Sequence, residues 1–126
     1  MNGYISHIEQ VALENENFRK VLFTAKHSQL VLMSLLPGEE IGEEVHHLDQ
    51  FIRFEQGMGK VVLDGEEQTV ADGDAVVIPE GTRHNVINMS QTEKLKLYTI
   101  YSPPEHRDGT IHTTKADAMA DEHDEA

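Results

Sequence analysis

The chain has 126 residues and a formal net charge of −13 at pH 7, and it contains no cysteine. Its length fits one domain that buries a core of its own, and the lack of cysteine excludes disulfides, thiol nucleophiles and cysteine-based zinc sites. The negative charge argues against nucleic acid or an anionic membrane as a partner, because both are polyanions. No apolar run has transmembrane length and the first residues do not resemble a signal peptide, so we expect a cytoplasmic protein.

Short strand-like runs, separated by turn signals, follow one another along the chain. Asp64 and Gly65 are typical of a two-residue hairpin turn, and residues 72–74 indicate another turn. Residues 94–101 alternate between apolar and polar side chains, as a half-buried strand does. The expected strands cover residues 18–25, 30–36, 60–63, 67–70, 75–78 and 94–101.

Many short strands at regular spacing are typical of an all-β barrel or sandwich. Only residues 114–121 have a helical composition. We therefore predict a β domain over residues 1–113, with strands near the N-terminus, and an acidic C-terminal tail over residues 114–126 that carries a short helix. The acidic side chains that end the chain are expected to be solvated.

Two segments of the chain combine glycines, histidines and oxygen donors at defined spacings. Residues 38–57 have the pattern G-x5-E-x-H-x3-Q-x6-G, and residues 79–88 have the pattern P-x-G-x2-H-x3-N. The positions that carry these patterns are Gly38, Glu44, His46, Gln50, Gly57, Pro79, Gly81, His84 and Asn88.

These two segments resemble the two sequence motifs of the cupin superfamily, and the resemblance extends over residues 30–101, most closely to small single-domain cupins. It implies a double-stranded β-helix, or jelly-roll, barrel. In that family three histidines and one glutamate hold a metal ion inside the barrel. Here Glu44 stands where the first histidine of the motif belongs, and Gln50 stands where the glutamate belongs.

A metal ion would also explain why polar side chains alternate with apolar ones in this region. Residues two apart share one face of a strand, so Glu44 and His46 point the same way, and Gln50 has the same parity. Burying such groups without partners costs about 1–3 kcal/mol each, whereas one ion satisfies them together. With His84 from a distant strand, they are predicted to hold one divalent transition metal, and the donors do not distinguish Mn, Fe, Co, Ni and Zn.

Each candidate site residue also has an ordinary alternative role. His46 and His47 fit a solvated strand edge when taken alone, and Gln50 fits a hydrogen bond to the backbone. Tyr101 and Arg83 are candidate catalytic residues near the barrel mouth. Tyr101 equally suits a half-buried barrel position, and Arg83 equally suits a surface ion pair. His106 and His112 follow in an irregular segment, either as caps of the barrel mouth or as exposed loop histidines.

The resemblance implies a metal-dependent enzyme acting on a small organic acid or sugar derivative, of oxygenase, isomerase, epimerase or decarboxylase type. The alternative is a non-catalytic domain that binds a sugar-like ligand in the barrel, and a storage barrel is a third possibility. Because both imidazoles must be neutral to bind a metal, we expect affinity to fall below about pH 6. A homodimer is expected, because sheet edges need covering and the N-terminal segment carries spare apolar residues: Tyr4, Ile5, Ile8, Val11 and Leu13.

Overall fold

The structure, a computed structural model, describes residues 2–126 and forms nine strands and two helices in this range. The strands are β1 (Arg19–Thr24), β2 (Gln29–Leu35), β3 (Asp49–Gln56), β4 (Met58–Leu63), β5 (Glu66–Ala71), β6 (Ala75–Ile78), β7 (His84–Asn88), β8 (Leu95–Ser102) and β9 (Ile111–His112). The helices are α1 (Ile8–Glu14) and α2 (Lys115–Ala120).

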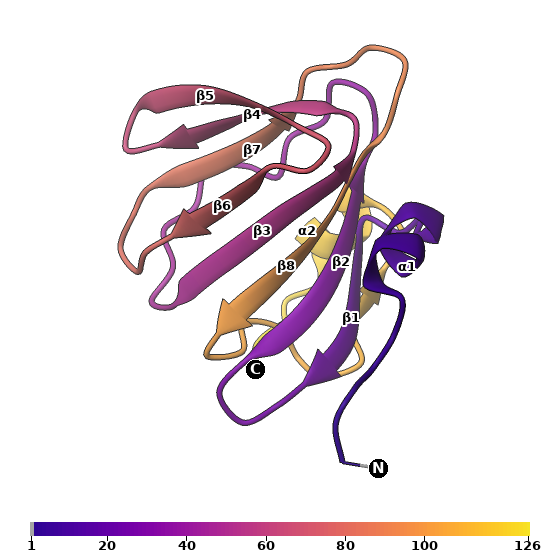
Figure 1. The fold of residues 1–126 in the computed structure, drawn as a ribbon. Coiled ribbons are helices and arrows are strands. Elements are labelled where there is room, and N and C mark those ends of the chain that lie inside the picture. Colours follow the sequence, from indigo (N-terminus) through magenta and orange to yellow (C-terminus); the bar gives the residue numbers. More distant parts are fainter. Residues whose placement is uncertain (1) are drawn as a thin grey trace.

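The strands form two antiparallel sheets that face each other as a jelly-roll barrel (Figure 1). The larger sheet has the order β6-β3-β8-β2-β1-β9, and the smaller one has the order β5-β4-β7. Strands far apart in the sequence are therefore neighbours, as in the pairing of β2 with β8. This arrangement confirms the predicted all-β fold, and each predicted strand corresponds to one observed strand within one or two residues at each end.

The hairpin between β4 and β5 turns at Asp64 and Gly65, as predicted. Both residues have a positive φ, 48° and 86°, and Leu63 pairs with Glu66 across the two-residue turn. Two consecutive positive φ angles are typical of the tight turns that match strand twist. The turn therefore sets the register of β4 against β5.

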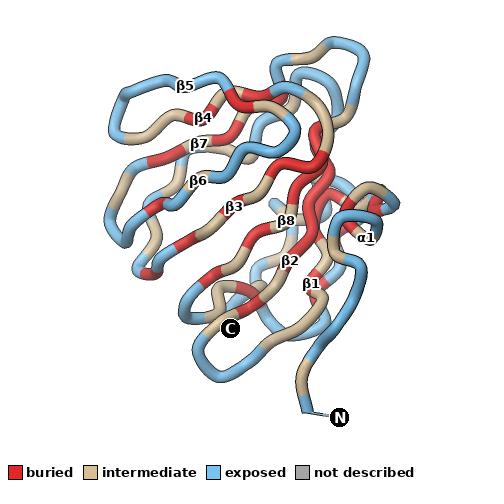
Figure 2. The backbone as a smooth tube through the Cα atoms, in the orientation of Figure 1, coloured by how far each residue is buried: buried red, intermediate tan, exposed pale blue. Residues whose placement is uncertain are grey.

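The core lies between the two sheets (Figure 2). On β3 the inward side chains are Gln50, Ile52 and Phe54, and Ile52 and Phe54 are fully buried. Gly57, which ends the first motif, has a φ of 97°, and a Cβ at this position would lie 2.7 Å from the carbonyl oxygen of Lys94. The motif therefore needs glycine here for both conformation and space.

The C-terminal helix forms as predicted, and its first turn is closed by a reciprocal capping box between Thr114 and Asp117. The expectation that no other segment is helical is wrong, because residues Ile8–Glu14 form α1. This helix packs on β3 and β8 and buries Ala12. In residues 2–126 neither helix has the length and apolar character needed to span a bilayer.

Part of the apolar N-terminal segment is thus used within the chain. Tyr4 stacks on Phe23 with 6.1 Å between ring centroids, whereas Ile5 remains 82% exposed. The homodimer stays a prediction.

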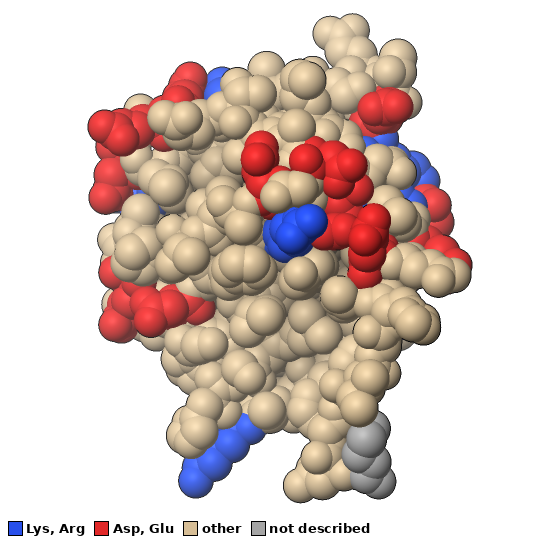
Figure 3. Space-filling model, viewed as in Figure 1, with Lys and Arg blue, Asp and Glu red and all other residues tan. Residues whose placement is uncertain are grey.

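Figure 3 shows acidic side chains in several separate groups on one face of the molecule, with few basic side chains between them.

Candidate metal centre

Glu44 and His84 are fixed opposite each other by their backbones. The amide of Glu44 donates to the carbonyl of His84 at 2.8 Å, and the amide of His84 donates to the carbonyl of Glu44 at 2.9 Å. This isolated bridge joins the segment before β3 to the first residue of β7. Directly opposed residues of an antiparallel bridge place their side chains on the same face. The two predicted ligands therefore meet although forty residues separate them in the sequence.

His46 completes a cluster with this pair. One donor atom from each of Glu44, His46 and His84 lies within 4.8 Å of the others. The two imidazole rings meet edge to face, with 5.0 Å between their centroids. The side chain of His46 is only 10% exposed. Three of the four predicted ligands thus converge at one point.

A hydrogen bond to the backbone fixes the direction of the His84 imidazole. Its Nδ1 lies 2.9 Å from the carbonyl oxygen of Thr82. A carbonyl only accepts, so Nδ1 carries a proton and donates it to this bond, which leaves Nε2 as the nitrogen that can bind an ion when the imidazole is neutral. A backbone carbonyl holding one ring nitrogen is the usual way in which proteins prepare the other nitrogen as a ligand.

Gln50 points into the barrel with its amide oriented by Thr99. The Thr99 hydroxyl donates to the carbonyl of Phe51 at 2.8 Å and therefore accepts from Nε2 of Gln50 at 3.0 Å. Within the described residues, Oε1 of Gln50 is buried and has no hydrogen-bond partner. The amide contact is with a side chain and not with the backbone, and it leaves one buried oxygen donor free.

The Nε2 atom of His46 lies between two carboxylates. It is 3.0 Å from Oε2 of Glu105 and 3.3 Å from Oε2 of Glu44. Burial by itself lowers the pKa of His46, but the hydrogen bonds and negative charges of Glu105 and Glu44 outweigh it and raise that pKa to about 9. Burial also acts to raise the pKa of Glu44, but His46 holds it below the ordinary carboxyl value.

Sequence reasoning missed Glu105, which belongs to neither motif. Glu105 follows β8, and the buried side chain of Gln29 holds the backbone of Glu105 and of the next residue. Oε1 of Gln29 accepts from the amides of Glu105 at 3.2 Å and His106 at 2.9 Å, and its Nε2 donates to the carbonyl of His106 at 2.7 Å. No local pattern could have indicated this residue, since its position depends on a contact with β2.

The two candidate catalytic residues lie in different surroundings. Tyr101 is buried next to the cluster, with its ring 6.0 Å from that of His46 and 5.1 Å from that of His106. Burial raises the pKa of Tyr101, so its phenol stays protonated. The guanidinium of Arg83 is exposed and pairs with Glu43 at 2.8 Å, which is the surface ion pair considered above.

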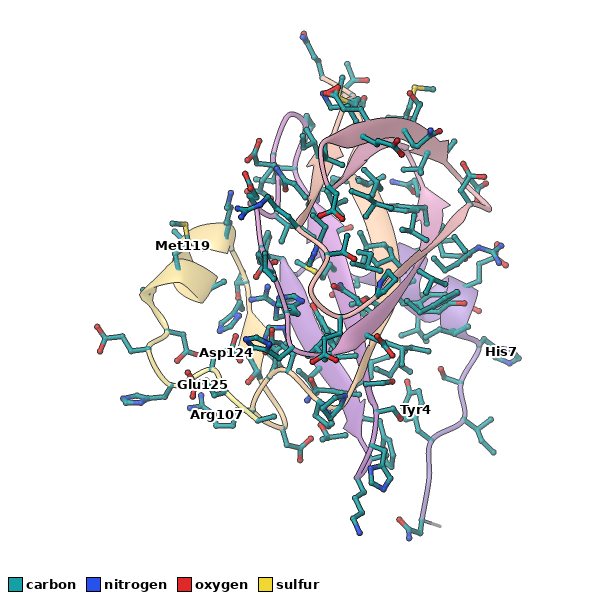
Figure 4. The ribbon with its side chains drawn as sticks, turned by 90° about the vertical axis from the view of Figure 1, so that its left-hand side faces the viewer. Tyr4, His7, Arg107, Met119, Asp124 and Glu125 are labelled. Carbon is teal, nitrogen blue, oxygen red and sulfur yellow. The ribbon has the colours of Figure 1, made fainter. Side chains whose placement is uncertain are left out.

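The C-terminal segment folds back against the barrel, and its predicted solvation is wrong for Asp124. This carboxylate is 12% exposed and accepts from Nδ1 of His106 at 2.8 Å. Arg19 on β1 lies 3.7 Å from it. His106 and His112 are buried and are not exposed loop histidines. In Figure 4 Asp124 lies on the barrel side of the C-terminal segment, while Met119 of α2 points away.

A second group of potential metal donors lies in this segment. His112, Asp121 and Asp124 also place donor atoms within 4.8 Å of one another. The guanidinium of Arg19, however, lies 3.3 Å from Nδ1 of His112, and His112 pairs with Asp121 at 2.9 Å. Arg19 already supplies the positive charge that these carboxylates require. The cluster is therefore an ion-pair network that holds the C-terminal segment against the barrel.

A cavity of about 350 Å³ lies between the barrel and the C-terminal segment. Glu44 and Glu105 line it next to the histidine cluster, and α2 forms its other wall. Its charged lining is mostly acidic: Glu44, Glu105, Asp121, Asp124 and Glu125 face Arg19 and Lys115. Of the predicted ligands, Glu44 lines this cavity, so the cavity lies beside the candidate metal centre.

Comparison with known proteins agrees with this architecture. The model of the Cupin domain family matches residues 31–101. The uncharacterised protein YrkC of Bacillus subtilis is 48% identical over 126 residues, which covers 94% of this chain and 67% of YrkC.

Solved structures give the same result. The crystal structure of BH2720 from Bacillus halodurans has 45% identity and a TM-score of 0.92, and the match covers 95% of this chain and 96% of that one. A salicylate 1,2-dioxygenase mutant from Pseudoaminobacter salicylatoxidans has 18% identity and a TM-score of 0.56, over 60% of this chain and 21% of that one. That likeness shows the fold alone.

Proposed function

Because this chain belongs to the cupin family, we propose that it binds one divalent transition metal ion and acts as an enzyme on a small organic acid or sugar derivative. The proposed ligands are Glu44, His46, Gln50 and His84. The observation that carries the proposal is the convergence of donor atoms from Glu44, His46 and His84 within 4.8 Å. Imidazole and oxygen donors together suit Mn, Fe, Co, Ni or Zn.

The surroundings of these residues fit such an ion. Gln50 has a buried amide oxygen without a partner among residues 2–126, and a metal would satisfy it. The hydrogen bond to Thr82 engages Nδ1 of His84 and leaves Nε2 as the nitrogen available to an ion. When bound, the ion would polarise a carbonyl or hydroxyl group of a substrate.

The residues around the cluster would orient the substrate and handle protons. Tyr101 keeps its phenolic proton, because burial raises its pKa, so it would serve as a hydrogen-bond donor to the substrate. The C-terminal segment shields one side of the cavity from water. Its mostly acidic lining repels free anions and favours a neutral, hydroxyl-rich ligand such as a sugar derivative. The choice among oxygenase, isomerase, epimerase and decarboxylase chemistry depends on that ligand.

Metal analysis of protein purified without chelator tests the proposal. We expect one transition metal ion per chain in the parent and almost none in His46→Ala and His84→Ala, because each loses a strong nitrogen donor. His47→Ala is the matched control, since His47 is adjacent and exposed and its loss should not change metal content. Equal metal content in the parent and both cluster variants would rule out this site.

A non-catalytic binding protein is the second candidate. It is favoured by one observation: without an ion, His46 is already neutralised by Glu44 and Glu105 at 3.3 and 3.0 Å, so the cluster is stable as an ion-pair network. A parent that contains no metal, yet co-purifies with a sugar-like ligand in its barrel, would support this candidate.

We also propose a homodimer. Ile5 is 82% exposed and Ile111 on the edge strand β9 is 56% exposed, and a second copy would cover such apolar groups symmetrically. Light scattering at micromolar concentration would measure the mass directly. A monomer whose stability does not change on dilution contradicts the dimer.

A further inference from the structure

We propose that Glu105 is a further ligand of the metal ion, so that two carboxylates, Glu44 and Glu105, bind the ion together with the histidines. This inference rests on the proposed function and adds a ligand from outside both motif segments. The segment after β8 would thus contribute to metal binding, because its residue Glu105 contacts His46.

The distances around His46 support two carboxylate ligands. Two donor atoms that each bind an ion at about 2.1 Å lie about 3.0 Å apart at a right angle and about 3.4 Å apart at a tetrahedral angle. Oε2 of Glu105 and Oε2 of Glu44 lie 3.0 and 3.3 Å from Nε2 of His46. Each oxygen thus has a separation from this nitrogen that ligands of one ion have. Glu105 is outside the group whose donor atoms all lie within 4.8 Å of one another, which is Glu44, His46 and His84, so its side chain would turn toward these residues when the ion binds.

A metal on Nε2 of His46 also removes the hydrogen bond that Glu105 now accepts. The carboxylate of Glu105 would then face the ion without an N–H donor between them. A partly buried carboxylate without a hydrogen-bond donor is destabilised by desolvation. Binding the ion would remove this destabilisation. The same argument applies to Glu44, which contacts the same nitrogen.

Charge and rigidity point the same way. Gln50 is neutral at the position where the cupin motif has glutamate, so Glu44 alone would leave a divalent ion with one uncompensated charge. A second carboxylate makes the site neutral. The backbone of Glu105 is held by Gln29, whose side chain is 1% exposed, so the residue stays beside His46 and only its side chain has to reorient when the ion binds.

Titration of metal-free protein with Co²⁺, followed by calorimetry and by the visible absorption of the bound ion, tests the inference without any activity assay. We expect Glu105→Gln and Glu105→Asp to weaken Co²⁺ binding at least tenfold and to change the absorption bands. Glu105→Asp keeps the charge but shortens the side chain, so it separates ligation from long-range charge. Glu122→Gln, at an exposed position of the tail, removes one charge far from the cluster and should bind as the parent does.

The alternative role of Glu105 is an ion pair with His46 that competes with the metal. In that case Glu105→Gln would bind Co²⁺ as tightly as the parent or more tightly, and the inference would be overturned while the proposed function stands. A parent that binds no Co²⁺ would instead overturn the proposed function itself. Because the backbone of Glu105 makes its contacts with Gln29 through its amide, both variants keep that support, and either one suffices if the other fails to fold.

Discussion

Nε2 of His46 lies 3.0 Å from Oε2 of Glu105, and this contact joins the first cupin motif to the segment that follows the last long strand. The two carboxylates at His46 stabilise its protonated form and raise its pKa to about 9. The metal-free cluster therefore holds a proton at the place where the ion would bind, and proton and metal compete for one nitrogen.

The metal-free protein should lose stability as the pH rises. The pKa of His46 is about 9 in the folded state against an ordinary value of 6.5, so its contribution is complete below pH 6.5 and disappears as the pH passes 9. We expect the free energy of unfolding to fall by on the order of 2–3 kcal/mol over that window. Urea unfolding in the presence of chelator measures it, and His46→Gln should flatten the profile. A parent profile that is flat between pH 6.5 and pH 9 contradicts the protonated ion-pair network.

Metal affinity should have the opposite dependence on pH. Because the proton on His46 must leave before Nε2 can bind an ion, affinity should already weaken as the pH falls from 9, and not only below about pH 6 as the sequence suggests. Calorimetry at pH 7.5 in buffers of different ionisation enthalpy should detect about one proton released per bound ion. No proton release at this pH would mean that the metal does not bind His46 through the protonated nitrogen.

Gln50→Glu should separate the stability of the barrel from its affinity for metal. The Thr99 hydroxyl gives its proton to Phe51, so a carboxylate at position 50 would meet an acceptor where the amide now donates. We expect the metal-free variant to lose roughly 1–3 kcal/mol of stability and to regain it on metal binding, because the added charge makes a stronger ligand. Gln68→Glu, on the exposed face of β5, adds the same charge and should change neither quantity. A Gln50→Glu variant as stable as the parent without metal would contradict the Thr99 contact.

Asp124→Asn should loosen the C-terminal segment. This change weakens the pairing of His106 and of Arg19, which is itself largely buried. The expected loss is about 1–3 kcal/mol, together with faster cleavage of the tail by protease. Glu122→Gln serves as the control in the same segment. Unchanged proteolysis in Asp124→Asn would show that the tail is held by other contacts.

The sequence by itself determined the fold and the central part of the candidate site. Period-two alternation and turn residues such as Asp64 and Gly65 are local signals, and they predicted the strands because a strand's faces depend only on neighbouring residues. The motif spacings placed His46 and Gln50 on the inner face for the same reason. Helix α1 was missed, because seven residues with mixed apolar spacing acquire helical structure mainly by packing on β3 and β8.

Only the tertiary structure decided which distant groups meet in the site. Glu105 reaches His46 because the buried Gln29 fixes the chain after β8, and no spacing in the sequence encodes that contact. Asp124 is largely buried because Arg19 on β1 pairs with it. The same acidic run without a partner would stay solvated. The pairing of charges between segments far apart depends on how the two sheets and the C-terminal segment pack together, and local residue patterns carry no information about that packing.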